Sequence, residues 1–322
     1  MQTKIEGSTI LITGGAGFIG SYIVEELIPL RPKKITIIDN LIRGGLLNMI
    51  GFKDNPIIEF HEGDIRDSAL VDKCMKGCDY LFHLAALRIN ACAADPKEGF
   101  DVMIKGTFDI IEKAKLHHVK KIIYSSSASV YGLATHFPTP ETDNPYDNQT
   151  FYGGAKLWGE QLLRSYKFMF NMDYVALRYF NVYGPRMDTD GKYTEVMIRW
   201  LDCIRDGKNP LIFGDGSTTM DFVYVQDIAK ANIAALVADV TDEAFNIGTS
   251  TETSLKELLE TLLKVNNSNL SYELRPSNTI NPVQRRLSDI SKAEQLLHFK
   301  PEVSLESGLK KLSSWYFQLQ KK

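Results

Sequence analysis

Residues 9–20 read Thr9-Ile10-Leu11-Ile12-Thr13-Gly14-Gly15-Ala16-Gly17-Phe18-Ile19-Gly20. The apolar run at the start predicts a buried strand, and a helical pattern follows from Gly17 to about Ile28. The glycines between them have separate tasks. Gly14 permits a sharp turn off the strand, Gly17 lets the backbone approach a pyrophosphate, and Gly20 lets the helix pack tightly on the sheet.

This glycine turn predicts a dinucleotide-binding site. Backbone N–H groups at the helix start would face the phosphates, where the helix dipole favours negative charge. A plain tight turn is the alternative for the glycine spacing alone. Its position between a strand and a helix favours the binding site.

The pattern of apolar runs extends the fold outward from this turn. Short runs predict strands at 34–39, 57–60, 80–83, 121–126, 174–178 and 245–248, and longer amphipathic runs predict helices at 100–117, 158–170, 227–240, 253–264 and 291–297. Continuous apolar strands separated by helices indicate a parallel sheet covered on both faces. We therefore expect an α/β protein. Its Rossmann-type, doubly wound dinucleotide-binding domain spans 1–181, with segments near 223–250 returning to it. Residues 182–322 form mainly a smaller, interleaved α/β lobe that we expect to bind the substrate.

The composition narrows the class of protein. The chain has 322 residues, a net charge of −3 and 44% hydrophobic residues, which is ordinary for a globular protein and gives no reason to expect nucleic-acid or membrane partners. The N-terminal residues 1–6 carry no apolar signal sequence, so we expect a cytoplasmic location. Cys74 and Cys78 are four residues apart and could share a helix face, but no second Cys/His pair matches them. We expect buried thiols and no metal site.

Asp39 refines the identity of the dinucleotide. It ends the second predicted strand, 19 residues beyond Gly20. A carboxylate there can accept hydrogen bonds from both ribose hydroxyls of adenosine and would repel a 2′-phosphate, which favours NAD over NADP. Arg43 lies close enough to weaken this discrimination, and a helix cap or loop aspartate is the alternative interpretation of Asp39.

Three further motifs follow in order: Tyr124-Ser125-Ser126-Ser127, Tyr152-Gly153-Gly154-Ala155-Lys156 and Arg178-Tyr179-Phe180-Asn181. With the glycine turn, they resemble the extended short-chain dehydrogenase/reductase superfamily, and within it the NAD-dependent nucleotide-sugar epimerase/dehydratase family (UDP-glucose 4-epimerase-like). The resemblance covers nearly the whole chain. It includes Asp64-Ile65, His83-Leu84-Ala85-Ala86, Gly214-Asp215-Gly216, Asp221-Phe222-Val223-Tyr224-Val225 and Asp289-Ile290-Ser291-Lys292-Ala293.

Tyr152 and Lys156 share a helix face because they are four residues apart. A tyrosine with a pKa of about 10 is a poor base, but a nearby ammonium and a positive nicotinamide ring favour the phenolate. Lowering the pKa by about three units needs roughly 4 kcal/mol. Tyr152 would then take a proton from a substrate hydroxyl, Ser127 would hydrogen-bond the same oxygen, and Lys156 would also hold the nicotinamide ribose. A half-buried aromatic ring and a solvated charge are the alternative interpretations.

The resemblance implies a set of binding residues. Asp64 and Ile65 would flank the adenine, residues 84–86 would line the dinucleotide, and Asn181 would reach the substrate diphosphate. The implied NAD site comprises Gly14, Gly17, Phe18, Ile19, Gly20, Asp39, Asn40, Asp64, Ile65, Leu84, Ala85, Ala86, Ser125, Tyr152, Lys156, Tyr179 and Phe180. The implied nucleotide-sugar site comprises Ser127, Tyr152, Asn181 and Arg275. Asn181 could instead be a turn residue, and Arg275 a solvated loop charge.

The residues after Ser127 favour one reaction of the family. Members that eliminate water need an acid in the segment 127–129, and Ala128 and Ser129 cannot protonate a leaving hydroxyl. A 4-epimerase needs no such acid, because it oxidises C4 to a 4-keto sugar and reduces it again on the other face. The open alternatives are a 4,6-dehydratase, a decarboxylase, a 4-keto reductase or a non-catalytic NAD sensor.

Two residues depart from the family pattern. Met103 stands where an Asn usually supports the active site, and Met220 where an Arg usually grips the diphosphate. These changes leave the nucleotide and the sugar open.

The helices near 97–117 and 152–171 carry apolar residues beyond the needs of one core face: Phe100, Phe108, Trp158, Phe168, Met169 and Phe170. In the family the matching helices form a four-helix bundle, so we expect a homodimer. Packing within the monomer is the alternative.

Overall fold

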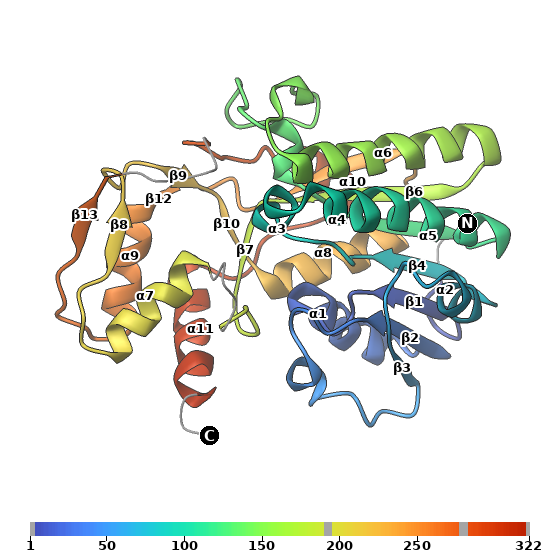
Figure 1. Cartoon of the computed structure of the whole chain (residues 1–322), viewed down its shortest axis with the longest axis horizontal. Helices are drawn as coiled ribbons and strands as arrows, with labels where there is room; N and C mark the ends of the chain where they lie inside the picture. The colour runs from blue at the N-terminus through green and yellow to red at the C-terminus, as the bar shows by residue number, and fades with distance from the viewer. Residues whose placement is uncertain (1–3, 190–194, 277–282, 320–322) are drawn as a thin grey trace.

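The computed structural model describes residues 4–189, 195–276 and 283–319. Seven parallel strands form one sheet in the order β11-β6-β5-β4-β1-β2-β3 (Figure 1). The strands are β1 (Thr9–Thr13), β2 (Lys34–Asp39), β3 (Ile58–Glu62), β4 (Tyr80–His83), β5 (Lys121–Ser127), β6 (Asp173–Tyr179) and β11 (Glu243–Ile247). This confirms the predicted Rossmann-type sheet and the return of a late segment to its edge.

Helices cover both faces of the sheet. The face with α1 (Phe18–Leu27) and α8 (Val225–Val237) forms one core cluster, and the face with α2 (Ser68–Met75), α5 (Thr107–Leu116) and α6 (Phe151–Phe170) forms another. Ile10 and Ile12 of β1 point into the first cluster and Leu11 into the second. A strand buried on both sides needs apolar residues at every position, which explains its unbroken apolar sequence. Cys74 and Cys78 are buried in the second cluster, as expected.

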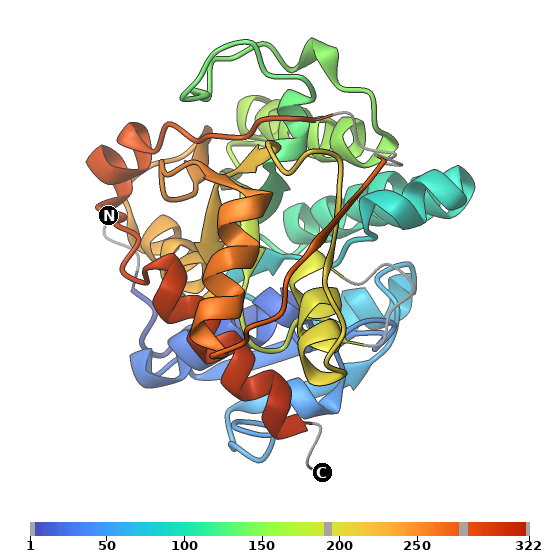
Figure 2. The same ribbon diagram turned by 90° about the vertical axis from the view of Figure 1, so that its left-hand side faces the viewer.

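The smaller lobe lies at the left in Figure 1 and faces the viewer in Figure 2. Its core packs α7 (Val196–Arg205), α9 (Leu255–Val265) and α11 (Leu305–Leu319) together with β8 (Leu211–Phe213), which pairs with β13 (Glu273–Arg275). Short ladders join it to the sheet domain: β7 (Asn181–Tyr183) with β10 (Phe222–Tyr224), and β9 (Thr219–Met220) with β12 (Thr253–Ser254). Helix α10 (Ser291–Leu297) returns to pack on β11 and α8.

Two helices near the predicted site differ from the sequence expectation. The helix expected over 100–117 is a π-helix, η3 (Phe100–Gly106), followed by α5, and the short helices α3 (Ile89–Ala94) and α4 (Pro96–Gly99) precede it. The apolar pattern marks only 158–170 of helix α6, but the helix begins at Phe151, as the Tyr152–Lys156 motif predicts to within one residue, and the Thr150 side chain caps it by accepting a hydrogen bond from the Gly153 N–H at 3.1 Å. Tyr152 and Lys156 therefore lie in its first two turns.

The remaining described elements are single turns of 3₁₀-helix: η1 (Ile28–Leu30), η2 (Leu46–Met49), η4 (Ala128–Tyr131) and η5 (Pro145–Asp147). Within the described ranges, no helix has the length and apolar character needed to cross a bilayer.

Candidate active site

A cleft of about 620 Å³ opens at the carboxyl ends of β1, β4, β5 and β6. It lies where the strand order reverses between β1 and β4, which is where open parallel sheets bind their ligands. Of the residues predicted for the NAD and sugar sites, all but Arg275 line this cleft. The structure thus brings together residues from seven separate segments of the sequence.

The glycine turn leaves no room for side chains. Gly14 has a φ of +77°, and a Cβ there would lie 2.9 Å from the Ala85 backbone nitrogen. A Cβ on Gly20 would lie 2.2 Å from the Gly14 carbonyl oxygen. Gly17 is the N-cap residue of α1 and has no side chain to cap the helix. The first N–H groups of α1 therefore have no side-chain acceptor and face the cleft. Such a cradle fits the pyrophosphate of a dinucleotide.

Asp39 supports the turn and faces the cleft at the same time. One carboxylate oxygen accepts the Ala16 N–H at 3.0 Å, and the other accepts the Leu41 N–H at 2.9 Å. Burial raises the pKa of this carboxyl, and the backbone donors counteract that rise. Each oxygen keeps a further lone pair, so Asp39 can accept hydrogen bonds from ribose hydroxyls as the sequence predicts.

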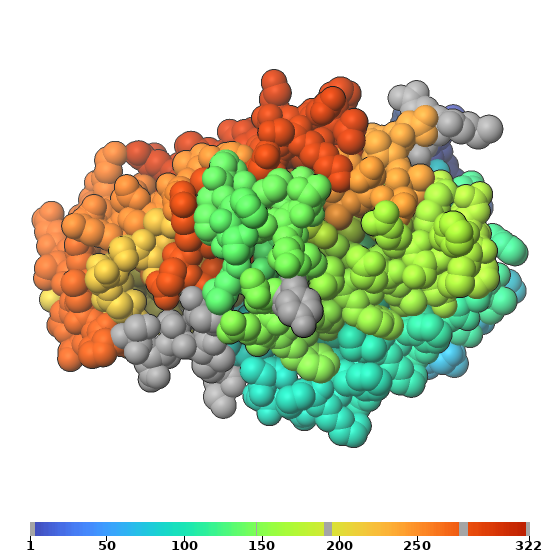
Figure 3. All heavy atoms as spheres, turned by 90° about the horizontal axis from the view of Figure 1, so that it is seen from above, coloured from blue at the N-terminus to red at the C-terminus, as the bar shows by residue number. Residues whose placement is uncertain are grey.

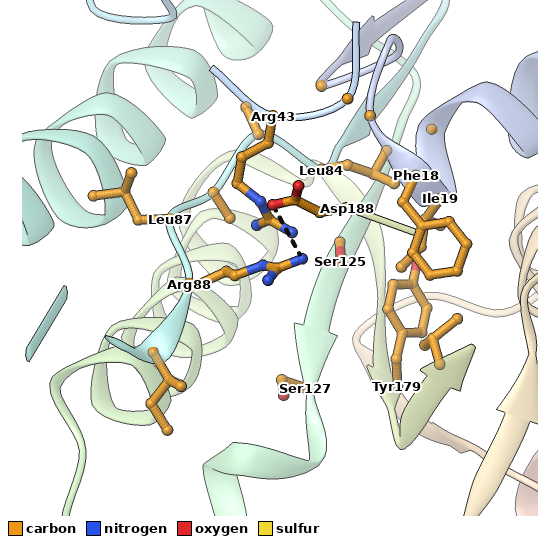
Figure 4. A pocket seen from close by; sticks show the side chains of 18 of the residues that line it. Phe18, Ile19, Arg43, Leu84, Leu87, Arg88, Ser125, Ser127, Tyr179 and Asp188 are labelled. Carbon is orange, nitrogen blue, oxygen red and sulfur yellow. Dashed lines mark ion pairs between the residues drawn. The ribbon is translucent and has the colours of Figure 1, made fainter. Parts of the chain in front are cut away.

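Two arginines approach one another across the cleft (Figure 4). Arg88 pairs with Asp188 at 3.9 Å and with Glu195 at 3.7 Å. Arg43 lies beside them, and its Nε is buried without a hydrogen-bond partner among the described residues. Burial lowers the pKa of Arg43 to about 10, so it remains charged near neutrality. An unsatisfied buried donor in a cationic cleft fits an anionic ligand such as a dinucleotide.

Ser127, Tyr152 and Lys156 meet where β5 ends and α6 begins. Ser127 lies beside Tyr152 and lowers its pKa, and the Ser127 hydroxyl oxygen accepts the Ser129 N–H at 3.1 Å. Lys156 is buried and donates from Nζ to the Ser125 carbonyl at 2.6 Å. Burial lowers the pKa of Lys156 to about 8. A base, a hydroxyl beside it and a fixed cation are therefore assembled at one point of the cleft.

The electrostatics of Tyr152 involve residues that the sequence did not single out for this role. Burial raises its pKa, while Ser127 and the charges of Arg43 and Arg286 lower it. The protein alone therefore holds the pKa of Tyr152 above its ordinary value. The lowering attributed to Lys156 together with a nicotinamide ring stays a prediction.

Met103 occupies the turn of the π-helix that faces this group. Its sulfur accepts the Leu87 N–H at 3.2 Å, and its side chain packs with Cys92 and Ala155 close to Tyr152. π-Helical turns often mark functional sites because the widened turn re-aims side chains. At this position the Met103 thioether makes an apolar contact, where the family pattern has the side-chain amide of an Asn.

Other motif residues support the fold. Arg178 forms a buried bidentate ion pair with Glu160 at 2.7 and 3.0 Å, so it anchors the strand end. Asp221 is fully buried and accepts hydrogen bonds from residues 249, 250 and 288. His83 joins Thr13 to Thr107 and is neutral, because burial lowers its pKa to about 3.

Two arginines that could serve a phosphate are held elsewhere. Arg275 lies on β13, is exposed, and pairs with Glu273 at 2.8 Å outside the cleft. Its placement matches the alternative of a solvated charge, because β13 pairs with β8 at the outer side of the small lobe. Arg186 lines the cleft but is bound to Glu25 and Ser21 of α1.

The sequence missed most of the small-lobe wall. This wall includes Met187, Asp188, Glu195, Met197, Arg199, Phe222, Leu255 and Arg286. Phe222 lies in the motif at 221–225 but was given no role at the site, and no local motif surrounds the other residues before Arg286. Arg286 had one signal, the doublet Arg285-Arg286 just before the motif at 289–293.

Comparisons with known proteins agree with this site. A model of the NAD dependent epimerase/dehydratase family matches residues 10–248. A putative UDP-glucose 4-epimerase of Methanocaldococcus jannaschii is 37% identical, covering 95% of this chain and 97% of that protein. A UDP-N-acetyl-alpha-D-glucosaminuronate decarboxylase of Bacillus cytotoxicus is 33% identical, covering 96% and 98%.

Among solved structures, the chain is similar to a UDP-N-acetylglucosamine 4-epimerase from Methanobrevibacter ruminantium in complex with UDP-N-acetylmuramic acid. The two are 33% identical, the TM-score is 0.92, and the match covers 98% of this chain and 99% of that one. The family model spans the glycine turn, the group Ser127, Tyr152 and Lys156, and strand β11. The chain belongs to the NAD-dependent epimerase/dehydratase family, and its cofactor is NAD.

Proposed function

We propose that this protein is a UDP-sugar 4-epimerase that retains its NAD through each turnover. The observation that carries the proposal is the group Ser127, Tyr152 and Lys156 beside a wall that lacks an acid at residues 128 and 129. Ala128 is buried in a small apolar cluster, and Ser129 is a neutral hydroxyl. UDP is proposed as the nucleotide because the relatives reported above act on or bind UDP-sugars.

The chain's own residues supply the proton chemistry. Tyr152 removes the proton from the C4 hydroxyl, and Ser127 holds the same oxygen by a hydrogen bond. When bound, NAD supplies the reversible oxidation of that carbon. Lys156, fixed by the Ser125 carbonyl, places positive charge behind Tyr152. After the 4-keto sugar has rotated in the cleft, Tyr152 returns the proton to the oxygen.

The binding roles follow from the cleft. We assign Asp39 and Asn40 to the adenosine ribose, Asp64 and Ile65 to the adenine, and Asn181 to the diphosphate, with the sheet domain 1–181 holding NAD and the small lobe holding the sugar nucleotide. Arg275 receives no role in this proposal because it lies outside the cleft. A cytoplasmic location remains part of the proposal.

Decarboxylation of a UDP-uronic acid is the second candidate. The 33% identity to a decarboxylase over nearly the whole chain favours it. Both reactions pass through the same 4-keto sugar, so they differ only in the steps after oxidation.

One experiment separates the candidates. UDP-sugars are incubated with the purified protein without added cofactor, and the products are identified by NMR. A C4 epimer without net NAD reduction supports the proposal. Release of CO₂ with formation of a pentose nucleotide, or no turnover of any UDP-sugar, contradicts it.

We also propose a homodimer formed through α5 and α6, which lie side by side on the sheet domain (Figure 1). Phe168 is 93% exposed, which is unusual for a phenylalanine that serves only its own monomer. The other exposed apolar residues nearby are Phe100, Phe108, Leu116, Met169 and Phe170. Light scattering should give twice the 36.3 kDa monomer mass, and Phe168→Lys should weaken association. Only monomer at micromolar concentration would contradict the dimer.

A further inference from the structure

Arg286 lies on a segment that is fixed from both sides. The segment 283–290 runs from the small lobe back to the sheet domain, beside residues 133–147 (Figure 3). The Arg286 N–H donates to the Thr219 carbonyl at 3.0 Å, and the Thr139 N–H donates to the Leu287 carbonyl at 2.8 Å. The backbone position of Arg286 is therefore set by the fold before any ligand binds.

Neighbouring arginines on this segment behave differently. Arg285 pairs with Glu252 at 2.7 and 2.8 Å and lies over the Phe137 ring at 4.4 Å. Arg286 lines the cleft, and within the described ranges its guanidinium makes no side-chain hydrogen bond or ion pair. Asp147 lines the adjoining hollow with Arg286 but forms no ion pair with it. The segment thus presents one neutralised cation outside the cleft and one uncompensated cation inside it.

The surroundings of Arg286 place it near the reacting carbon. It borders the hollow formed by Ile89, Ser129 and Thr150, at the start of the helix that carries Tyr152. Its charge acts on Tyr152, and burial lowers its own pKa to about 10, so it is still protonated near neutrality. A group next to the hydroxyl that Tyr152 deprotonates would face the part of the wall that Arg286 lines.

The guanidinium of Arg286 is half-buried and has no anionic partner among the described residues, and its planar fork matches either a carboxylate or a phosphate bidentately. Its place beside Tyr152 favours a carboxylate on the sugar. We propose that Arg286 binds a carboxylate carried by the sugar beside C4, so that the substrate is a UDP-sugar acid rather than a neutral UDP-sugar. This inference rests on the proposed function and names its substrate class. The carboxylate can stand on C5, as in a uronic acid, or on an ether at C3, as in a muramic acid.

The test compares matched pairs of substrates with the NAD-loaded enzyme. UDP-glucuronic acid is compared with UDP-glucose, and UDP-N-acetylmuramic acid with UDP-N-acetylglucosamine, by kcat/KM. One acid should exceed its neutral partner by about 100-fold, the scale of a charge-assisted bidentate contact. The pair that shows the preference identifies which carboxylate is recognised. Equal or better use of both neutral sugars would overturn the inference and leave the epimerase proposal intact.

Variants separate a carboxylate site from a diphosphate site. Arg286→Gln should lose the preference for the acid over the neutral partner by about 30- to 100-fold. The loss of its charge beside Tyr152 affects acid and neutral sugars alike and cancels in this ratio. Arg286→Lys should recover part of the preference for the acid, because lysine restores the positive charge but not the bidentate geometry of the guanidinium. Arg285→Gln, the matched control, should leave both substrates unchanged. An equal loss for acid and neutral sugars in Arg286→Gln would assign Arg286 to the diphosphate and contradict the inference.

Two further readouts keep the outcome decisive. The melting temperature of Arg286→Gln should equal or exceed that of the wild type, because no intramolecular partner is lost.

If no UDP-sugar is turned over, the epimerase proposal fails, and calorimetric Kd values decide whether Arg286 recognises a carboxylate. Tighter binding of an acid that disappears in Arg286→Gln supports the inference, and equal Kd values for acid and neutral sugars contradict it. Decarboxylation of the acid would contradict the epimerase reaction while supporting carboxylate recognition.

Discussion

The two halves of the cleft are built in different ways. The NAD half consists of residues at or just beyond the carboxyl ends of strands β1 to β6, together with Tyr152 and Lys156 of α6. The sugar half consists of side chains from distant parts of the chain, including the loop after β7, helix α7, strand β9 and the segment 283–290. Parallel strands bring their carboxyl ends to one edge by necessity, whereas the small lobe needs its own packing to deliver residues there.

This difference shows which half can evolve a new ligand. The NAD half uses backbone groups and glycines, where a Cβ would collide with the main chain. The sugar half uses single side chains such as Met220, Arg199 and Arg286, none of which is held by an ion pair within the described part of the chain. Substitution there changes the ligand without disturbing the sheet. Met220 in place of the usual Arg is consistent with such a change.

The largest expected effect is at the junction of the two halves. Tyr152→Phe removes the group placed to accept the C4 hydroxyl proton and should lower kcat by about 10³- to 10⁴-fold. NAD content and the melting temperature should stay close to the wild-type values, because the ring remains in its packing. Initial rates with the best UDP-sugar measure the effect. A variant that kept a tenth of the activity would remove Tyr152 from the mechanism.

A second prediction contrasts a buried ion pair of the sheet domain with a surface pair at the small lobe. Glu160→Gln leaves Arg178 buried without its carboxylate and should lower the free energy of unfolding by about 3–5 kcal/mol. Arg285→Gln breaks an exposed pair and should change it by less than about 1 kcal/mol. Denaturant unfolding of both variants gives the comparison. Equal losses would mean that the strand end is not anchored as described.

Asp39 tests the NAD half alone. Asp39→Asn should weaken NAD binding by about 10- to 100-fold, because it removes charge-assisted acceptors from the adenosine ribose. NADP should lose less, since its 2′-phosphate no longer meets a carboxylate. Calorimetry on cofactor-free protein measures both. If the wild type already bound NADP as tightly as NAD, Asp39 would not be the selector.

The smallest predicted effect is a pH dependence. The pKa of Lys156 is lowered to about 8 because burial penalises its ammonium. The charged form used in the mechanism is present below that pH and is lost above it, so kcat/KM should fall by about tenfold per pH unit on the alkaline side. Lys156→Arg keeps its charge and should lack this limb. If the limb persists in the variant, it belongs to another group.

The sequence predicted the NAD half well because its signals are local. A glycine spacing, a strand-ending aspartate and Tyr152 four residues before Lys156 each specify a backbone geometry within one turn or helix. The apolar pattern marked only 158–170 of α6, and the motif from Tyr152 to Lys156 placed the start of the helix within one residue of Phe151.

The sugar half was predicted poorly for the complementary reason. Arg275 was considered as a phosphate partner because Met220 replaces the usual Arg, but strand β13 pairs with β8 and carries Arg275 away from the cleft. Arg286 reaches the cleft only because backbone bonds to Thr219 and Thr139 direct its segment there. The π-helix at Met103 has no local signal, since its sequence reads as ordinary helix. Such positions depend on contacts between segments far apart in the chain.

The central claim is that C4 is oxidised and reduced again within one turnover. A UDP-sugar carrying deuterium at C4 tests it most directly, with the NAD-loaded enzyme and no added cofactor. The account predicts a C4-inverted product, seen by NMR, that retains its deuterium at C4. An inverted product that has lost the deuterium, or a product with unchanged configuration at C4, would contradict it.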